Sequence, residues 1–278
     1  MFRTMYDTDV TVWSPQGRLL QVEYAMEAVK QGSACLGIVG SKYVVLAALK
    51  RSPHDLAAYQ KKLLKIDDHV GVAIAGLNAD ARTLAKYMRT ECLNHKYVFG
   101  APLQASRLLS DVADKHQRCT QTYVRRPYGV GFLVASCDAT GPHLYETCPS
   151  GNVHEYLAMA IGTRAQSAKT YLEKHHAEFP ALELDGLIKH ALKALAGCVP
   201  SEKELDKHCA SIAIVGDGMP LRMLDGDDVQ PYLDQIELEG GVPTPEAESK
   251  AEGGEPASDR GGGSCSRRSW RRSGTRGR

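Results

Sequence analysis

Residues 6–37 read Y-D-T-D-V-T-V-W-S-P-Q-G-R-L-L-Q-V-E-Y-A-M-E-A-V-K-Q-G-S-A-C-L-G, and the rest of the chain is organised around them. After an extended arm, Pro15 fixes φ and Gly17 supplies conformational freedom, which together predict a turn. A helix of about a dozen residues follows, because apolar side chains recur at the spacing of one helix face: Leu19, Val22, Met26 and Val29. Gly32 stands where a glycine commonly ends a helix. The stretch holds no nucleophile against a base, so it is typical of a docking element.

The same residues carry a family resemblance. Residues 6–25 match Y-D-x-x-x-x-x-x-S-P-x-G-R-L-x-Q-V-E-Y-A, and this pattern resembles the N-terminal motif of proteasome α subunits. Further similar segments lie at residues 60–68, 75–82 and 126–131, and the resemblance covers residues 1–237. It implies an α+β fold: the four-layer αββα sandwich of the N-terminal nucleophile hydrolases, with an extra N-terminal helix.

The side-chain pattern of the predicted strands suits sheets that pack together. In residues 70–75, V-G-V-A-I-A, large side chains alternate with small ones, so one face is bulky and the other nearly flat. Residues 128–134 and 211–215 repeat the pattern. Strands of this kind are covered on both faces. Groups of strands alternate with pairs of helices along the chain, which favours packed sheets with helices outside them.

Three of the predicted helix starts depend on capping residues. A side-chain oxygen at such a position accepts a hydrogen bond from one of the unpaired backbone N–H groups of the first turn. Asn78 and Asp185 are predicted N-caps, and Thr163-x-x-Gln166 matches a capping box.

Composition narrows the class of protein. The chain has 278 residues, 43% of them apolar, which suffices for one large core or two small ones. Its net charge of +1 is not that of a general polyanion binder. The eight cysteines include no C-x-x-C pair and the ten histidines lack zinc-ligand spacing, so we expect reduced thiols and no metal or other cofactor. His175-His176 lacks an H-E-x-x-H pattern and is predicted to be plain helix surface.

Secretory and membrane-spanning segments are also recognisable in a sequence. The sequence shows neither a signal peptide nor an apolar run long enough to span a bilayer. We therefore expect no membrane partner and a location in the cytoplasm and nucleus.

The composition changes near residue 240. Gly, Pro, Ser, Glu and Ala dominate there, and six arginines crowd the last part of the chain. Such a sequence cannot bury enough apolar surface to fold alone, so residues 240–278 are predicted to be a disordered, Arg-rich tail. Residues 241–278 carry eight basic and five acidic side chains, which leaves the folded body near −2. A solvated tail is the default, with nucleic-acid contact and an import signal as alternatives.

The resemblance also bears on catalysis, because the catalytic β relatives of this fold begin at a threonine exposed by cleavage after a glycine. There the free amino terminus is the base, with an acid and a lysine nearby. Ser33 follows Gly32 at the matching position, and Lys62 matches the lysine. No carboxylate lies near Leu49 or Lys50, where the acid should be. Without a base, the ~10²–10⁴-fold gain from proton transfer is lost, so we expect no catalysis. The alternative is an active hydrolase with Ser33 as nucleophile, produced by cleavage before it.

The resemblance implies partners. It places the chain with six other α subunits in a hetero-heptameric outer ring of the 20S proteasome core, against the ring of β subunits. This outer ring gates substrate access and docks the regulatory ATPase particle and other activators in ubiquitin-dependent protein degradation. Within this expectation residues 1–32 are a gate arm with a cap helix and residues 33–239 are the sandwich. The members of the family that this chain most resembles tend to end in acidic tails, so no role is transferred to residues 240–278. A nucleic-acid-binding protein that acts through its arginine tail is a further alternative.

Three sets of site residues follow from the resemblance. The gate residues are Tyr6, Asp7, Pro15 and Tyr24. A pocket between neighbouring α subunits receives the C-terminal carboxylates of activators. Lys62, Gly32 and Leu77 match residues that line this pocket, and Glu23 matches a residue that reaches into it from the adjacent subunit. The antechamber loop at residues 120–125 would project Tyr123 into the passage beneath the gate. Each set has a structural alternative. The four gate residues would merely hold the helix in place, Lys62 would be a solvated lysine, and residues 120–125 would be an ordinary loop.

Overall fold

The computed structural model describes residues 5–52, 54, 56–200 and 205–238. Contacts within the chain divide it into residues 1–243 and residues 244–278. The predicted tail, residues 240–278, lies outside the described residues. Its disorder, and the division of the chain into arm, sandwich and tail, therefore stay predictions.

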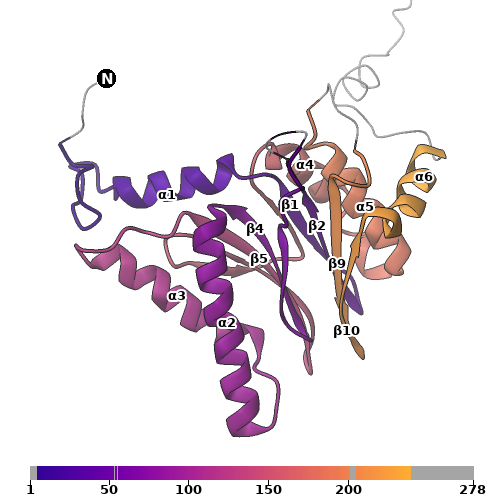
Figure 1. Cartoon of the computed structure of the whole chain (residues 1–278), viewed down its shortest axis with the longest axis horizontal. Helices are drawn as coiled ribbons and strands as arrows, with labels where there is room; N and C mark the ends of the chain where they lie inside the picture. The colour runs from indigo at the N-terminus through magenta and orange to yellow at the C-terminus, as the bar shows by residue number, and fades with distance from the viewer. Residues whose placement is uncertain (1–4, 53, 55, 201–204, 239–278) are drawn as a thin grey trace, which may run out of the picture. The chain divides into compact units, whose positions relative to one another are not determined.

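Two five-stranded antiparallel sheets form the middle of the described part (Figure 1). The first has the order β10-β9-β2-β1-β8. Its strands are β1 (Cys35–Val39), β2 (Tyr43–Leu49), β8 (Ala158–Ile161), β9 (Ala210–Gly216) and β10 (Met219–Asp225). The second has the order β3-β4-β5-β6-β7. Its strands are β3 (Leu63–Asp67), β4 (Val70–Gly76), β5 (Val130–Asp138), β6 (Gly141–Thr147) and β7 (Val153–Glu155).

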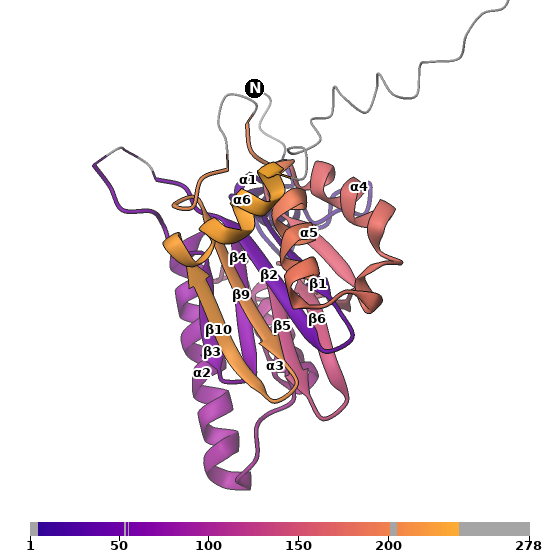
Figure 2. The same cartoon turned by 90° about the vertical axis from the view of Figure 1, so that its right-hand side faces the viewer.

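Helices cover the outer face of each sheet. The second sheet is covered by α2 (Asn78–Phe99) and α3 (Ala105–Gln121), and the first by α4 (Ala165–His175) and α5 (Leu184–Ala196). Beside α5 lies α6 (Gln230–Leu238), as Figure 2 shows. This is the predicted four-layer αββα sandwich. The extra helix α1 (Leu20–Gln31) lies across one end of it, against β4 and β5.

Three buried clusters hold the layers together. One fills the space between the first sheet and its helices, one fills the space between the second sheet and its helices, and one lies between the two sheets. In β4 the large side chains of Val70, Val72 and Ile74 face the helices, while Ala73 and Ala75 face the other sheet. The predicted alternation of large and small residues is confirmed. Its small face lets the sheets approach closely.

The predicted helix caps are wrong. The N-cap residue of α2 is Leu77, that of α4 is Arg164 and that of α5 is Glu183, and none of them makes a side-chain capping hydrogen bond. Two of the predicted caps have partners elsewhere in the fold: Thr163 Oγ1 donates to the Gly32 carbonyl oxygen (2.7 Å), and Asp185 Oδ1 accepts from the Tyr232 hydroxyl (3.2 Å). The third, Asn78, is itself the first residue of α2.

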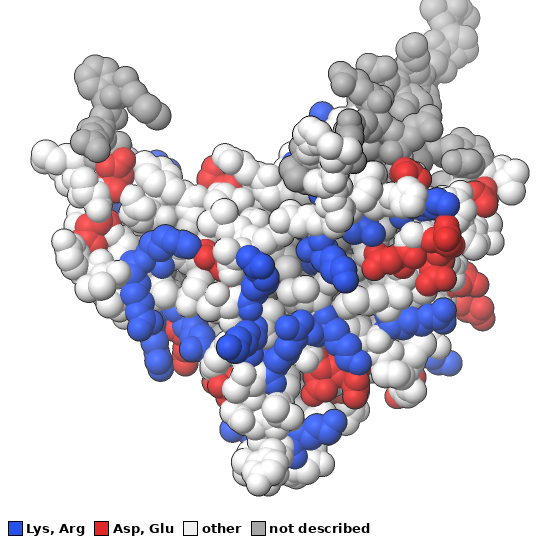
Figure 3. Space-filling model, viewed as in Figure 1, with Lys and Arg blue, Asp and Glu red and all other residues white. Residues whose placement is uncertain are grey.

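Charges of both signs are spread over the surface. On the face seen in Figure 3, Lys and Arg side chains form a band across the middle with acidic side chains among and beside them. Among the described helices, none is both long enough and apolar enough to cross a membrane.

Candidate functional site

The N-terminal arm is tied into a turn before α1 begins. Gly17 N–H donates to the Ser14 carbonyl oxygen (2.9 Å) and Ser14 N–H donates to that of Arg18 (2.9 Å). Ser14 Oγ in turn accepts from Arg18 N–H (3.1 Å), and Ser14 is buried. Gly17 has a φ of 74°, which glycine adopts without strain. The predicted turn is therefore confirmed, and it fixes where the arm leaves the helix.

Asp7 is the point at which the arm returns to α1. Gln21 Nε2 donates to the Asp7 carbonyl oxygen, and the Tyr24 hydroxyl donates to Asp7 Oδ2 (3.4 Å). Tyr24 is half exposed, Tyr6 is partly buried and Pro15 is exposed. Of the four predicted gate residues, the structure thus brings Asp7 and Tyr24 into contact.

Glu23 lies in the first turn of α1 and pairs within its own chain. Arg18 Nε donates to Glu23 Oε1 (2.8 Å), and the second guanidinium nitrogen of Arg18 contacts Oε2. This hydrogen bonding from Arg18 lowers the pKa of the Glu23 carboxyl. The pair braces the turn against the helix, and the reach of Glu23 toward an adjacent subunit stays a prediction.

The other end of α1 is pressed against the sandwich at Gly32. A Cβ atom at Gly32 would lie 2.3 Å from the backbone nitrogen of Gly76 and 3.0 Å from the carbonyl carbon of Ala75. Gly32 itself is extended, with φ −61° and ψ 154°, so glycine is needed here for close approach and not for a left-handed conformation. One turn earlier, Val29 packs over Gly131 of β5. Together these contacts hold the helix flat on the end of the second sheet.

Ser33, the residue after Gly32, lies where the resemblance places a nucleophile. The matching lysine and the position expected for the acid both lie beside it. Lys62 Nζ donates to the Ser33 carbonyl oxygen (2.6 Å), and Ser33 Oγ donates to the Leu49 carbonyl oxygen. The position expected for the acid therefore does lie beside Ser33, but it presents a main-chain carbonyl. The Ser33 nitrogen forms the peptide bond to Gly32 and so is not a free amine. The Ser33 hydroxyl thus donates to a main-chain carbonyl oxygen, which is not a base that could take its proton in catalysis.

Lys62 is enclosed, which the sequence did not predict. The residue is only 4% exposed, so the alternative of a solvated lysine is wrong. Burial lowers the pKa of its ammonium. Of the three N–H donors of an ammonium, one is taken by Ser33 in the described structure. The lysine thus ties β3 to the residue at which α1 ends.

Three of the four predicted pocket residues lie together at the end of β4. The Lys62 carbonyl oxygen accepts from Ile74 N–H (3.0 Å), and Gly32 abuts Gly76. Leu77, the next residue, donates its N–H to the Gly129 carbonyl oxygen (2.8 Å) and leaves its side chain half exposed. Lys62, Gly32 and Leu77 therefore lie near the end of β4, with Lys62 buried and Leu77 half exposed.

Comparison with known proteins is decisive for the family. A family model described as "Proteasome subunit" matches residues 29–215. A second model, which describes the N-terminal signature of A-type proteasome subunits, matches residues 6–28, and these hold the arm, the turn and most of α1. The chain belongs to the proteasome α-subunit family.

Curated proteasome α subunits are similar to this chain over most of its length. The alpha type-1 proteasome subunit of Dictyostelium discoideum is 52% identical over 86% of this chain and 97% of its own length. The alpha type-1 proteasome subunit of Trypanosoma brucei rhodesiense is 50% identical over 84% and 88%. A probable alpha type-6 proteasome subunit of Schizosaccharomyces pombe is 49% identical over 92% and 93%.

One ion pair in this α subunit was not predicted from its sequence. Arg126 contacts Asp80 with both guanidinium nitrogens (Nη1–Oδ2 2.7 Å and Nη2–Oδ1 2.8 Å), and Gly129 N–H also donates to Asp80 (3.0 Å). The Arg126 hydrogen bonds are the main cause that lowers the pKa of the Asp80 carboxyl. Both residues lie in segments that resemble the family, which is the signal that could have suggested a contact. The pair anchors the loop in which Tyr123 stands 78% exposed.

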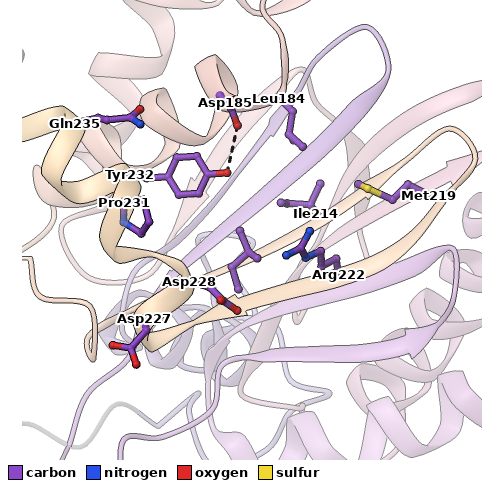
Figure 4. Close-up of a pocket in the computed structure, with 11 residues that line it drawn as sticks. Leu184, Asp185, Ile214, Met219, Arg222, Asp227, Asp228, Pro231, Tyr232 and Gln235 are labelled. Atoms are coloured by element: carbon purple, nitrogen blue, oxygen red, sulfur yellow. Dashed lines mark hydrogen bonds between the residues drawn. The ribbon is translucent and has the colours of Figure 1, made fainter.

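Two hollows lie in the described part of this α subunit. One, of about 430 Å³, lies between α1 and the segments around Thr147 and Gly162. The other, of about 360 Å³, lies between α5, α6 and β10, where Tyr232 points toward Asp185 (Figure 4). Among the eleven residues that line this second pocket there is no serine, cysteine or histidine to act as a nucleophile or its base.

Proposed function

We propose that this α subunit is a non-catalytic member of the outer ring of the 20S proteasome core. In this role it joins six different α subunits in a hetero-heptameric ring and rests on the ring of β subunits, which carry the catalysis. The single observation that supports this most is the covered end of the sandwich: α1 lies against β4, and Ser33 is joined to it through Gly32. A catalytic relative would need that nitrogen as a free base.

Substrate gating is the first part of the proposed role. The arm leaves the end of α1 through the Ser14–Gly17 turn and is held by Asp7, which contacts Gln21 and Tyr24. Few hydrogen bonds hold the arm to α1, so a change in its arrangement would cost little, which suits a gate. Tyr6 and Pro15 would meet their partners only in the ring, since Pro15 is exposed in the single chain.

Activator docking is the second part. Lys62, Gly32 and Leu77 form one side of a pocket that the neighbouring α subunit completes, with Glu23 contributed from that neighbour. The C-terminal carboxylate of the regulatory ATPase particle or of another activator would accept hydrogen bonds from the Lys62 ammonium. Tyr123, exposed on its anchored loop, would line the passage below the gate. The setting is ubiquitin-dependent protein degradation in the cytoplasm and nucleus.

Size-exclusion chromatography of a cell extract that contains the tagged chain tests assembly. We expect the chain to elute with the complete core particle, together with six other α subunits identified by mass spectrometry. A chain that elutes alone while the core particle is present would overturn the proposal.

A further inference from the structure

The outer helices α4 and α5 bring together three side chains that suit a metal ion. His175 is the last residue of α4, Glu178 follows it in the connecting turn, and His190 lies on α5. His175 Nδ1 lies 3.4 Å from Glu178 Oε1, and His190 Nε2 lies 3.8 Å from Glu178 Oε2. One nitrogen or oxygen from each residue lies within 4.8 Å of the other two. The prediction that His175 is plain surface is therefore wrong.

We propose that His175, Glu178 and His190 bind one divalent transition-metal ion of the zinc class. Two imidazoles and one carboxylate are a donor set that zinc accepts in a tetrahedral site, with a water molecule as fourth ligand. Bonds of ~2.0–2.2 Å in that geometry place neighbouring ligand atoms roughly 3.3–3.6 Å apart. The separations of 3.4 and 3.8 Å are measured to the two different oxygens of Glu178, and one donor atom from each residue lies within 4.8 Å of the others. Side-chain rotations that bring these donors closer would complete the site.

The surroundings of His190 fit a metal ligand as well. The Tyr171 hydroxyl lies 3.0 Å from His190 Nδ1. A tyrosine hydroxyl oxygen at this distance can accept the Nδ1 proton of the imidazole. That tautomer assigns the Nε2 lone pair to the metal. Histidine ligands commonly donate their second ring N–H in this way, which fixes their orientation.

Aromatic packing limits the movement of both rings. The Phe179 ring contacts that of His190 edge-on at 5.6 Å between centroids, and Phe179 is buried. The Tyr171 ring lies 4.6 Å from that of His175. Glu178 is the exposed member of the set, with 57% of its side chain accessible, so an ion could enter from solvent. A bound ion would connect the end of α4 to α5. These helices lie in a different layer from the arm and from Lys62, so the proposed site goes beyond the proposed function.

Zinc titration of the full-length chain tests the site. The variants His175→Asn and Glu178→Gln each remove one ligand at a partly exposed position. His176→Asn is the matched control, because His176 is the adjacent histidine and its Nδ1 contacts the Glu173 carbonyl oxygen outside the cluster. The eight cysteines offer other zinc ligands, so the readout is the difference between variants. Co²⁺ absorption in the visible range then reports whether the bound ion has nitrogen and oxygen ligands or thiolate ligands.

We expect the unchanged chain and His176→Asn to bind one zinc ion that both ligand variants bind at least ~10-fold more weakly. We expect Tyr171→Phe, which removes the proton acceptor of His190, to weaken zinc binding by ~10–100-fold. Equal binding by all five chains, or cobalt spectra from thiolate ligands alone, would overturn the assignment. Thermal melting in the presence of a chelator checks that each variant is folded, since none of these substitutions should alter the metal-free chain greatly.

Discussion

At the residue scale, the position of α1 depends on the close approach of Gly32 to Gly76. The neighbours of a Cβ at Gly32 are main-chain atoms of β4, which cannot move without shifting the strand. By contrast, a Cβ at Gly197, which ends α5, would meet the movable Ser167 Oγ at 3.0 Å. Both glycines have a φ of −61°, so the two sites differ in space and not in backbone strain.

We therefore predict that Gly32→Ala destabilises the full-length chain by about 1–3 kcal/mol, as overpacking does. Gly197→Ala is the matched control and should change the free energy of unfolding less. Urea unfolding of the two variants, compared through their midpoints, checks this. Equal midpoints would show that Gly32 does not fix the helix.

The Asp80–Arg126 pair is the second prediction at this scale. Asp80→Asn removes the charge that accepts hydrogen bonds from Arg126 and Gly129, so we expect a loss of about 1.5–3 kcal/mol at neutral pH. Because folding lowers the pKa of Asp80, its contribution is complete above the unfolded pKa of about 3.9. It is lost as pH falls below that value through the folded pKa.

Unfolding of Asp80→Asn and of the unchanged chain should therefore converge as pH falls below about 4. Asp68→Asn serves as the control, because Asp68 forms an exposed pair with Lys65. It should change the free energy of unfolding little at any pH. A constant gap between Asp80→Asn and the unchanged chain down to acid pH would contradict the role given to this carboxylate.

In the proposed function, activator docking depends on Lys62. Lys62→Met keeps the buried aliphatic part of the side chain and removes the ammonium. A hydrogen bond to a charged group is worth about 1.5–3 kcal/mol. Binding of an activator's C-terminal peptide to this pocket should therefore weaken roughly 10–100-fold. Its exposed neighbour provides the control, Lys61→Met. Photo-crosslinking of the peptide to this chain within purified core particles measures the effect. Equal crosslinking in both variants would remove Lys62 from the docking site.

At the element scale, the position of the arm depends on its contacts with α1. The arm is held to the helix by few hydrogen bonds, of which the one from Tyr24 to Asp7 is long at 3.4 Å. Such a bond contributes about 0.5–1.5 kcal/mol. A contact of this size biases an arm between two arrangements without locking it in either.

Tyr24→Phe in the assembled core particle should therefore lower activator-stimulated peptide hydrolysis by about two- to tenfold, through loss of this bond. Latent hydrolysis without activator should change little. Tyr97→Phe is the control, because Tyr97 is 89% exposed on α2, away from the arm. If Tyr24→Phe and Tyr97→Phe gave the same stimulated rate, the Asp7 contact would have no part in gating.

Elements whose pattern is long and local were predictable from the sequence. β4 contains the predicted residues 70–75, β9 contains residues 211–215, and α1 has the predicted length of about a dozen residues. Apolar runs or helical spacing extend over seven to twelve residues there. β7 and β8 were not predicted, since they have three and four residues and too little pattern to recognise. The capping predictions failed because Thr163 and Asp185 have tertiary partners that no local pattern reveals.

Site geometry was predictable where the family motif covers it. The structure places Lys62, Gly32 and Leu77 near one another, and their role as a pocket stays a prediction. The resemblance did not indicate that Lys62 is buried, because burial depends on strands that are distant in sequence. The His175–Glu178–His190 cluster was missed for the same reason. Two of its members lie on one helix and its turn, while His190 comes from the next helix.

At the scale of the whole molecule, the sandwich keeps the frame of a nucleophile hydrolase while its N-terminal segment covers the place where chemistry would begin. The serine, the lysine and the position of the acid are neighbours, yet a carbonyl oxygen replaces the carboxylate.

Intact-mass analysis of this chain, taken from purified core particles, tests the central claim most directly. We predict a mass in which residues before Ser33 are retained, in particles that hold six other α subunits beside this one in each outer ring. A mature chain that begins at Ser33 and hydrolyses peptides when isolated would contradict the account.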